Sequence, residues 1–592
     1  MPVHLVRLPL RRQNLWTNVF LAGRVFVIVI TVIRAFFQES VISTGIIFYV
    51  DGLKNLYRRN IDLARPVNAD MTALQILHNR FKDRGIITGF ALAVPDRSEY
   101  IELVEQAKAL DIIPVLFSAE KVLEKPVSLQ QQRWGLEDDS GNDTLLGASI
   151  ALAQQHTGWK TQVVIPLANL LVEAAEVYSS VELYRREAFD ACFAEERVTG
   201  GGWAIFSDEL LIGLLRSHED LMWARGGLAW ALRKPLYPFK LGSWHCPRVR
   251  ARLNVDLRLN SERMQSVYAT TKSADFASSN FSYERWLAES AWEAAYCDYG
   301  PQVVKLEPAN ECSGSCFNCP HNSMQRAVAH IQTGTFNRLV EDYSDGDDVR
   351  WLISGMGEPL LHPDIADMLR RLGNFQVSLH TSLQILPDNP DFPWSALDHL
   401  RISTDALSRE GFDQVRPGCN WENIEKFLTL ARERKKAMPD KFPEIGISML
   451  RHQLTENQQL AFLRYWKQVT SPVFRENFFR WPFDLPPEPV QWYQILGEAE
   501  YGRPGSRTSK VDFTPVKRRP CRHALLSATV LADGSVTICP FDYEGRHAFG
   551  NLNNQSLRDI WNAPAAKEFR LRHLQLQLVQ PCAECRDWYH PL

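Results

Sequence analysis

The placement of the cysteines restricts this chain more than any other feature of its sequence. Seven of the 11 cysteines form two groups and four are scattered. The first group is Cys312, Cys316 and Cys319, the second is Cys521, Cys539, Cys582 and Cys585, and the scattered ones are Cys192, Cys246, Cys297 and Cys419. Disulfide-stapled proteins are short and evenly studded with cysteines, whereas this chain has 592 residues. Grouped thiols in a long chain are typical of metal ligands.

The rest of the composition describes a protein with several packed domains. A prior of about 150 residues per domain predicts about four domains. A hydrophobic fraction of 45%, with 30 Phe, 17 Trp and 16 Tyr, is enough for several cores and excludes a disordered chain. The net charge of -3 argues against nucleic-acid binding, which usually needs a strongly basic surface.

Residues 1–44 are expected to be an N-terminal extension. Their densest apolar stretch, Val25–Ile33, lies between Arg24 and Arg34 and is too short for a helix that spans a membrane, which needs about 20 apolar residues. A positive segment followed by an apolar run is also typical of a signal peptide, but no convincing small-residue cleavage site follows. We therefore favour a cytoplasmic protein without a stable membrane span.

Two series of short apolar runs alternate with helical segments. The first, over residues 45–265, predicts an α/β domain with a parallel sheet, and residues 266–300 are expected to be a linker. The second, over 301–485, predicts a partial barrel of six strand–helix units, in which chemistry collects at the C-terminal ends of the strands. Its strand candidates are Val303–Leu306, Val349–Ile353, Val377–Leu379, Leu400–Ser403, Ile445–Met449 and Val473–Phe478.

The first cysteine group directly follows the first strand of the second series. Its spacing is C-x3-C-x2-C, with no fourth cysteine nearby in the sequence. Three thiolates from one loop can hold three irons of a cubane cluster and leave the fourth iron open. A structural zinc site normally uses four ligands, so zinc is the less favoured alternative.

The second strand of this series leads into a glycine-rich turn, Ser354-Gly355-Met356-Gly357-Glu358-Pro359. Glycine allows the backbone to approach a ligand closely, and a carboxylate at this place can hold an ammonium group. Taken alone, the segment is an ordinary turn.

Together, these two motifs resemble the radical S-adenosylmethionine (SAM) superfamily. The resemblance implies that the three loop cysteines ligate a [4Fe-4S] cluster whose open iron binds SAM. It also implies a SAM contact for the turn at Gly355, Gly357, Glu358 and Pro359, and a SAM carboxylate site at Ser403 and Arg416. One departure is Asn318, where the superfamily usually has a large apolar residue before the third cysteine.

The second cysteine group belongs to the region 510–592. The turn Asp533-Gly534 between apolar runs predicts a hairpin, which brings Cys521 and Cys539 together, and the terminal Cys582–Cys585 pair completes four ligands. Four cysteines suit zinc or a [4Fe-4S] cluster equally. The segment is similar to the SPASM/twitch extension of radical SAM enzymes, which implies one auxiliary [4Fe-4S] cluster and makes Asp542 a candidate proton acceptor.

The whole chain resembles the spiro-SPASM family, in which an N-terminal domain precedes the radical SAM core. Here that domain resembles nucleotidyltransferases but lacks their glycine-rich loop, so it is expected to be degenerate. The resemblance implies reductive SAM cleavage to a 5′-deoxyadenosyl radical that abstracts hydrogen from a peptide or sugar-linked substrate. It also implies an electron donor such as flavodoxin or ferredoxin. The alternative is a zinc- or cluster-stabilised binding protein without catalysis that has a nucleotide-sugar-like domain.

Overall fold

The structure is a computed structural model. It describes residues 43–50, 63–68, 70–83, 85–118, 121, 146–194, 202–223, 228, 232, 239–244, 259, 262–271, 275–317, 319–344, 349–387, 389, 391–437, 442–470, 490–497, 499–501, 506–508 and 518–588. Asn318 and the strand expected at Val473–Phe478 lie outside the described residues, as do residues 1–42. In the described part of the chain, no helix combines the length and apolar character needed to cross a membrane.

The N-terminal lobe is built on a seven-stranded sheet in the order β5-β4-β1-β6-β8-β7-β9. Its strands are β1 (Thr44–Tyr49), β4 (Gly89–Pro95), β5 (Ile113–Phe117), β6 (Thr161–Pro166), β7 (Ala191–Ala194), β8 (Ala204–Ser207) and β9 (Leu241–Trp244). Strands β5, β4, β1 and β6 are parallel, and β8 runs antiparallel to both of its neighbours. This is the predicted α/β domain.

Helices cover both faces of this sheet, because its central strand is apolar on both sides. In β1, Ile46 and Phe48 belong to one buried core, whereas Ile47 and Tyr49 belong to another. The helices are α2 (Ala73–Phe81), α3 (Ile101–Ala109), α5 (Gly147–Thr157), α6 (Ala174–Glu187), α7 (Asp208–Ser217) and α8 (Glu219–Met222), and a small hairpin adds β2 (Pro66–Asn68) and β3 (Met71–Thr72).

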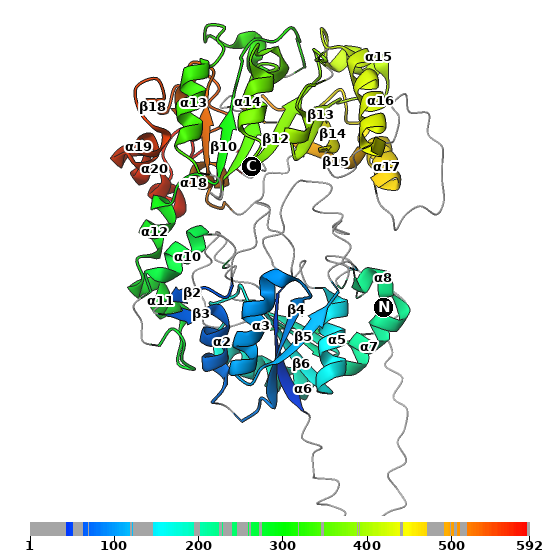
Figure 1. Cartoon of the computed structure of the whole chain (residues 1–592), viewed down its shortest axis with the longest axis vertical. Coiled ribbons are helices and arrows are strands. Elements are labelled where there is room, and N and C mark those ends of the chain that lie inside the picture. Colours follow the sequence, from blue (N-terminus) through cyan, green and yellow to red (C-terminus); the bar gives the residue numbers. More distant parts are fainter. Residues whose placement is uncertain are drawn as a thin grey trace, which may run out of the picture.

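The segment expected to be a linker contains three helices, α10 (Glu262–Ala269), α11 (Tyr283–Glu289) and α12 (Trp292–Asp298). Their aromatic side chains Tyr268, Trp286 and Trp292 are buried in the N-terminal core. The helices lie along one side of the molecule between its two lobes (Figure 1). The segment expected to be a linker therefore contains packed helices, whose buried aromatic side chains lie on either side of the small polar residues between α10 and α11.

The second lobe is built on a nine-stranded sheet. Six parallel strands lie side by side in chain order: β10 (Val303–Leu306), β11 (Arg350–Ile353), β12 (Gln376–Thr381), β13 (His399–Ser403), β14 (Glu444–Arg451) and β15 (Val490–Gly497). Five coincide with predicted strands, and the sixth strand described lies after residue 485, where the predicted core ended. The helices of this lobe are α13 (Thr333–Glu341), α14 (Ile365–Arg371), α15 (Arg409–Val415), α16 (Trp421–Ala437) and α17 (Gln459–Thr470).

The C-terminal region continues this sheet. Strand β16 (Ser527–Val530) pairs in parallel with β10, and the antiparallel strands β17 (Ser535–Thr537) and β18 (Ala548–Asn551) follow. The predicted hairpin is confirmed: Thr529 pairs with Thr537, and Gly534 takes a positive φ of 85° in the turn. Helices α18 (Arg522–Leu526), α19 (Leu557–Asn562) and α20 (Pro564–Leu574) complete the region (Figure 1).

Candidate active site

A cavity of about 490 Å³ lies against the parallel strands of the second lobe. Side chains alternate across a strand, so every second residue points to the same face of the sheet. Four neighbouring strands line the cavity in this way, with Val303 and Lys305 of β10, Arg350 and Leu352 of β11, Gln376, Ser378 and His380 of β12, and His399, Arg401 and Ser403 of β13. The volume is that of a site for a cofactor or a small ligand.

The loop that follows β10 brings Cys312, Cys316 and Cys319 to this cavity. Two backbone hydrogen bonds hold the loop to the end of α15 and the segment after it: Phe317 donates to Val415 over 2.8 Å, and Ser315 donates to Pro417 over 2.7 Å. The close approach requires Gly418, which has a φ of 81° and whose Cβ, if present, would lie 2.6 Å from the Ser313 carbonyl oxygen. The three predicted ligands are therefore brought together at one wall of the cavity.

The same segment carries a fourth thiol to the loop. The Sγ atoms of Cys316 and Cys419 are 3.8 Å apart, and Gln384 Nε2 donates to Cys312 Sγ over 2.9 Å. Cys419 was among the scattered cysteines, because nothing in the sequence places it beside a loop about a hundred residues earlier. Unlike the three loop cysteines, it is not among the residues that line the cavity.

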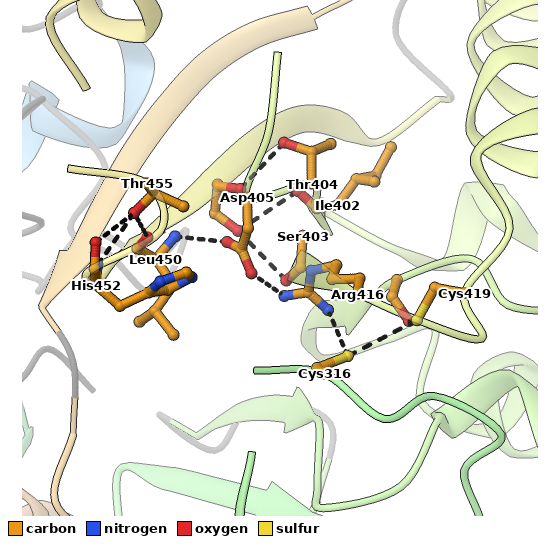
Figure 2. Close-up of polar contacts among 12 residues, drawn as sticks. Cys316, Ile402, Ser403, Thr404, Asp405, Arg416, Cys419, Leu450, His452 and Thr455 are labelled. Carbon is orange, nitrogen blue, oxygen red and sulfur yellow. Dashed lines mark hydrogen bonds and ion pairs between the residues drawn. The ribbon is translucent and has the colours of Figure 1, made fainter. Parts of the chain in front are cut away.

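Arg416 links this thiol group to a buried carboxylate. Its guanidinium lies 2.6 Å from Asp405 Oδ2, and its Nη1 lies 3.6 Å from Cys316 Sγ. Figure 2 shows the contacts running from Asp405 through Arg416 and Cys316 to Cys419. The contact between the two thiols raises the pKa of Cys316 and lowers the pKa of Cys419, since one thiol donates to the sulfur of the other. The charge of Arg416 acts to lower the pKa of both thiols, and a guanidinium beside a thiol favours the thiolate form that binds a metal.

The donor set fits an iron–sulfur cluster. Three thiols come from one loop, and Arg416 beside them offsets the negative charge that ligation brings. A cubane takes one thiolate on each iron, so its ligands do not converge on one point. Within the described residues, no group of three or more His, Cys, Asp or Glu side chains is close enough together to hold a single metal ion.

The glycines of the turn after β11 are required by close packing. A Cβ on Gly355 would lie 2.2 Å from Glu307 Cγ. A Cβ on Gly357 would lie 2.4 Å and 2.5 Å from the carbonyl oxygens of Ala309 and Glu311, which are backbone atoms that cannot move away. The turn therefore lies directly against the start of the cysteine loop. Gly355, Gly357, Glu358 and Pro359 all line the cavity, as predicted for a binding turn.

The Glu358 side chain, however, is already fully bonded. Its Oε1 accepts from Thr381 Oγ1 (2.6 Å) and the Leu360 amide (3.3 Å), and its Oε2 accepts from the amide and hydroxyl of Ser382 (both 3.0 Å). These four bonds use the acceptor capacity of a carboxylate. The geometry gives Glu358 the role of fixing the ends of β11 and β12, and it leaves backbone groups of the turn, rather than this carboxylate, to meet an ammonium group.

A second buried carboxylate ties the cavity wall to the C-terminal region. Glu307, 1% exposed, pairs with Arg326 at 2.8 Å. It also accepts from the amides of Met356 at 3.0 Å and Ala532 at 3.3 Å. No local sequence pattern marks Glu307, because its three partners come from separate segments.

Ser403 and Arg416 line the same cavity as the cysteine loop. Ser403 Oγ lies 3.4 Å from Ser448 Oγ on the neighbouring strand β14. The structure thus brings together the two residues expected to hold the SAM carboxylate, and their role stays a prediction.

The second cysteine group also lies together. Burial is the main cause that raises the pKa values of these thiols, to about 11 for Cys521 and about 12 for Cys582, and the charges of neighbouring cysteines of the group add to it. Arg518 donates to the carbonyl oxygens of Cys585 (2.8 Å) and Cys582 (3.2 Å). A metal that binds these thiols would have to displace their protons, and Arg518 beside them would offset part of the negative charge of the thiolates.

Asp542 does not line the cavity, although its neighbours Pro540 and Phe541 do. Its two carboxylate oxygens accept from the backbone amides of Arg546 (3.0 Å) and His547 (2.9 Å). This is a turn-stabilising arrangement. The expectation that Asp542 accepts a substrate proton is not supported by this geometry.

Comparison with known proteins identifies the C-terminal region. Residues 521–586 match the SPASM family model, described as an iron-sulfur cluster-binding domain, which confirms the predicted SPASM-type domain. A protein of Treponema pallidum (strain Nichols), named only "Uncharacterized protein", is 22% identical over 271 residues, which cover 43% of this chain and 67% of the relative.

Solved structures are similar at a coarse level. BtrN in complex with AdoMet and 2-DOIA is 15% identical, with 47% of this chain and 89% of BtrN covered and a TM-score of 0.29. Streptococcus suis SuiB bound to precursor peptide SuiA is 12% identical, with coverages of 68% and 93% and a TM-score of 0.33. A cytidylyltransferase from Leptospira borgpetersenii is 16% identical, with coverages of 42% and 93% and a TM-score of 0.33. At these TM-scores, none of the likenesses extends to the function of this chain.

Proposed function

We propose that this protein is a radical SAM enzyme. The observation that carries the proposal is that one cavity is lined by all three cysteines of the C-x3-C-x2-C loop, by the Gly355–Pro359 turn, and by Ser403 and Arg416. These parts come from three different strand ends of a parallel sheet, which is where such a fold collects its chemistry. The SPASM-type domain at residues 521–586 agrees with this assignment.

Cys312, Cys316 and Cys319 would hold a [4Fe-4S] cluster, and Ser403 and Arg416 would hold the carboxylate of SAM. When bound, the reduced cluster and SAM together supply a 5′-deoxyadenosyl radical, which abstracts hydrogen from the substrate. The protein itself orients the ligands and shields the cavity. The pairing of Arg416 with Asp405 keeps the guanidinium directed at the cysteine loop, and the bonds from Glu358 to Thr381 and Ser382 hold the binding turn rigid.

The second cysteine group would hold one auxiliary [4Fe-4S] cluster with four protein ligands. A cluster with a thiolate on every iron has no open position, so it would transfer an electron or support the fold rather than bind SAM. We expect flavodoxin or ferredoxin to supply the electron, the substrate to be a peptide or a sugar-linked molecule, and the protein to act in the cytoplasm.

The rival function is a zinc- or cluster-stabilised binding protein without catalysis. It explains the C-terminal cysteines as well, but it gives no reason for three thiols and an ion-paired arginine on the wall of a cavity. The two functions differ in what the loop cysteines do, so that loop is the place to test them.

The test is to reconstitute the protein anaerobically, measure iron and sulfide, reduce it with dithionite, and follow 5′-deoxyadenosine and methionine from SAM. We expect two clusters per chain and SAM cleavage. Replacing the three loop cysteines by alanine should abolish SAM cleavage and remove about half of the bound iron. Cys192→Ala, a buried free thiol in the N-terminal sheet, is the matched control and should keep both. SAM cleavage that survives the triple change would refute the proposal.

A further inference from the structure

We propose that the substrate of this site carries an oxyanion, a phosphoryl or carboxylate group, bound by a basic lining made of Lys305 and Arg401. This inference rests on the proposed function, because it names the substrate class of the same cavity. The wall of this cavity carries positively charged side chains, whereas the interior of a barrel is usually apolar.

Strand register places the basic lining on one face. Lys305 pairs with Leu352, Leu352 with Ser378, and Ser378 with His399, so these four residues form one layer across β10 to β13. His380 pairs with Arg401 in the next layer toward the C-terminal strand ends. All six residues line the cavity, together with Arg350 one layer below.

The nearby carboxylates are already committed to other partners. Glu358 is bonded to Thr381 and Ser382, and Asp405 pairs with Arg416. Glu307, two residues after Lys305, pairs with Arg326. Among the residues that the structure describes, no ion pair joins a carboxylate to Lys305 or Arg401. The Nε of Arg401 is buried without a hydrogen-bond partner. Lys305 and Arg401 are therefore two cations on this wall that form no direct ion pair with a carboxylate of the described residues.

Burying these charged groups lowers the stability of the folded protein. Burial lowers the pKa of Lys305 to about 8, although the charge of Glu307 acts in the opposite direction. Burial likewise lowers the pKa of Arg401 to about 10. Buried cations are normally paired, so a set of unpaired ones facing a cavity indicates a site for an anionic ligand.

The carboxylate of SAM does not account for the basic lining. Arg416 contacts the cysteine loop and Ser403 is the last residue of β13, whereas Arg401 and Lys305 lie earlier along their strands. A guanidinium binds two oxygens of one phosphoryl or carboxylate group, and an ammonium adds a third donor. The part of the substrate that enters beside Lys305 and Arg401 is therefore expected to carry the oxyanion.

The experiment is isothermal titration calorimetry on the anaerobically reconstituted full chain with saturating SAM. Inorganic pyrophosphate probes a phosphoryl group and succinate probes a carboxylate. We expect one of the two to bind, and Lys305→Met and Arg401→Met each to weaken that binding at least tenfold. Arg370→Gln, an exposed arginine of α14, is the control and should bind like the parent protein.

Lys305→Arg keeps the charge and should retain binding, which separates a lost cation from a damaged fold. Binding of neither probe, equal binding by the Met variants, or competition of the probe with SAM would overturn the inference. SAM cleavage is measured on the same samples. Cleavage without probe binding refutes only the oxyanion site, whereas probe binding without cleavage supports that site and refutes the proposed function.

Discussion

Replacing Glu307 by glutamine tests how the cavity wall is held to the C-terminal region. Glu307 and Arg326 form a buried ion pair, with side chains 2% and 8% exposed. The change keeps the shape but leaves the Arg326 guanidinium without its counter-charge. It also turns an amide nitrogen toward groups that only donate, since Met356 and Ala532 both donate to this carboxylate.

Breaking one side of a buried ion pair costs about 3–5 kcal/mol, and we expect Glu307→Gln to lower the free energy of unfolding of this lobe by that amount. The same loss should appear as faster hydrogen exchange at the amides of Met356 and Ala532. If these amides exchange only when the lobe unfolds, a loss of about 3 kcal/mol makes their exchange on the order of 100 times faster. Hydrogen exchange with mass spectrometry on peptides covering residues 354–358 and 530–534 measures it.

The matched control is Asp367→Asn, which breaks an exposed pair with Arg370 and should cost less than about 1 kcal/mol. Glu307→Gln combined with Arg326→Met should cost less than the sum of the single changes by about 0.5–3 kcal/mol, because the two residues share one interaction. A cost of less than about 1 kcal/mol for Glu307→Gln, with unchanged exchange at both peptides, would show that this pair does not hold the two regions together.

Three further outcomes follow from the site. Alanine at Cys312, Cys316 and Cys319 should remove the electron paramagnetic resonance signal that changes when SAM is added and leave the signal of the C-terminal cluster; loss of both signals would contradict separate sites. Cys419→Ala should keep the iron of the loop cluster, whereas iron loss as large as in Cys316→Ala would make Cys419 a ligand. Lys305→Met should be more stable than the parent at pH 7 by up to about 3 kcal/mol in phosphate-free buffer, because the lowered pKa means that the folded state binds the Lys305 proton less well than the unfolded state. Since that cost fades as the pH rises from about 8 to 10.5, the advantage in urea unfolding should disappear there; an advantage independent of pH would contradict the reasoning.

Much of the second lobe could be predicted from local sequence. Five of its parallel strands are short segments in which apolar residues either follow one another or alternate with polar ones, and both patterns are typical of strands. The hairpin at Gly534 could also be predicted from local sequence, because its turn needs a residue that tolerates a positive φ. The sixth strand described, Val490–Gly497, was missed because a strand at this place depends on pairing with β14.

The helices within residues 262–298 were not predicted from the sequence. Small polar residues suggested a linker, yet Trp286 and Trp292 are buried against the N-terminal core. Composition averaged over a segment hides a few large side chains, and burial of one aromatic ring contributes more to stability than several polar residues take away.

The sequence by itself determined which residue types could carry the chemistry: three thiols in one loop, a glycine-rich turn after the second strand, and four cysteines near the C-terminus. Only the tertiary structure decided that Cys419 and Arg416 meet the loop, that Glu358 and Asp542 are occupied by hydrogen bonds, and that Lys305 and Arg401 face one cavity. Spacing along the chain describes contacts within a segment. Contacts between strand ends depend on sheet order and register, which arise only when the whole lobe packs.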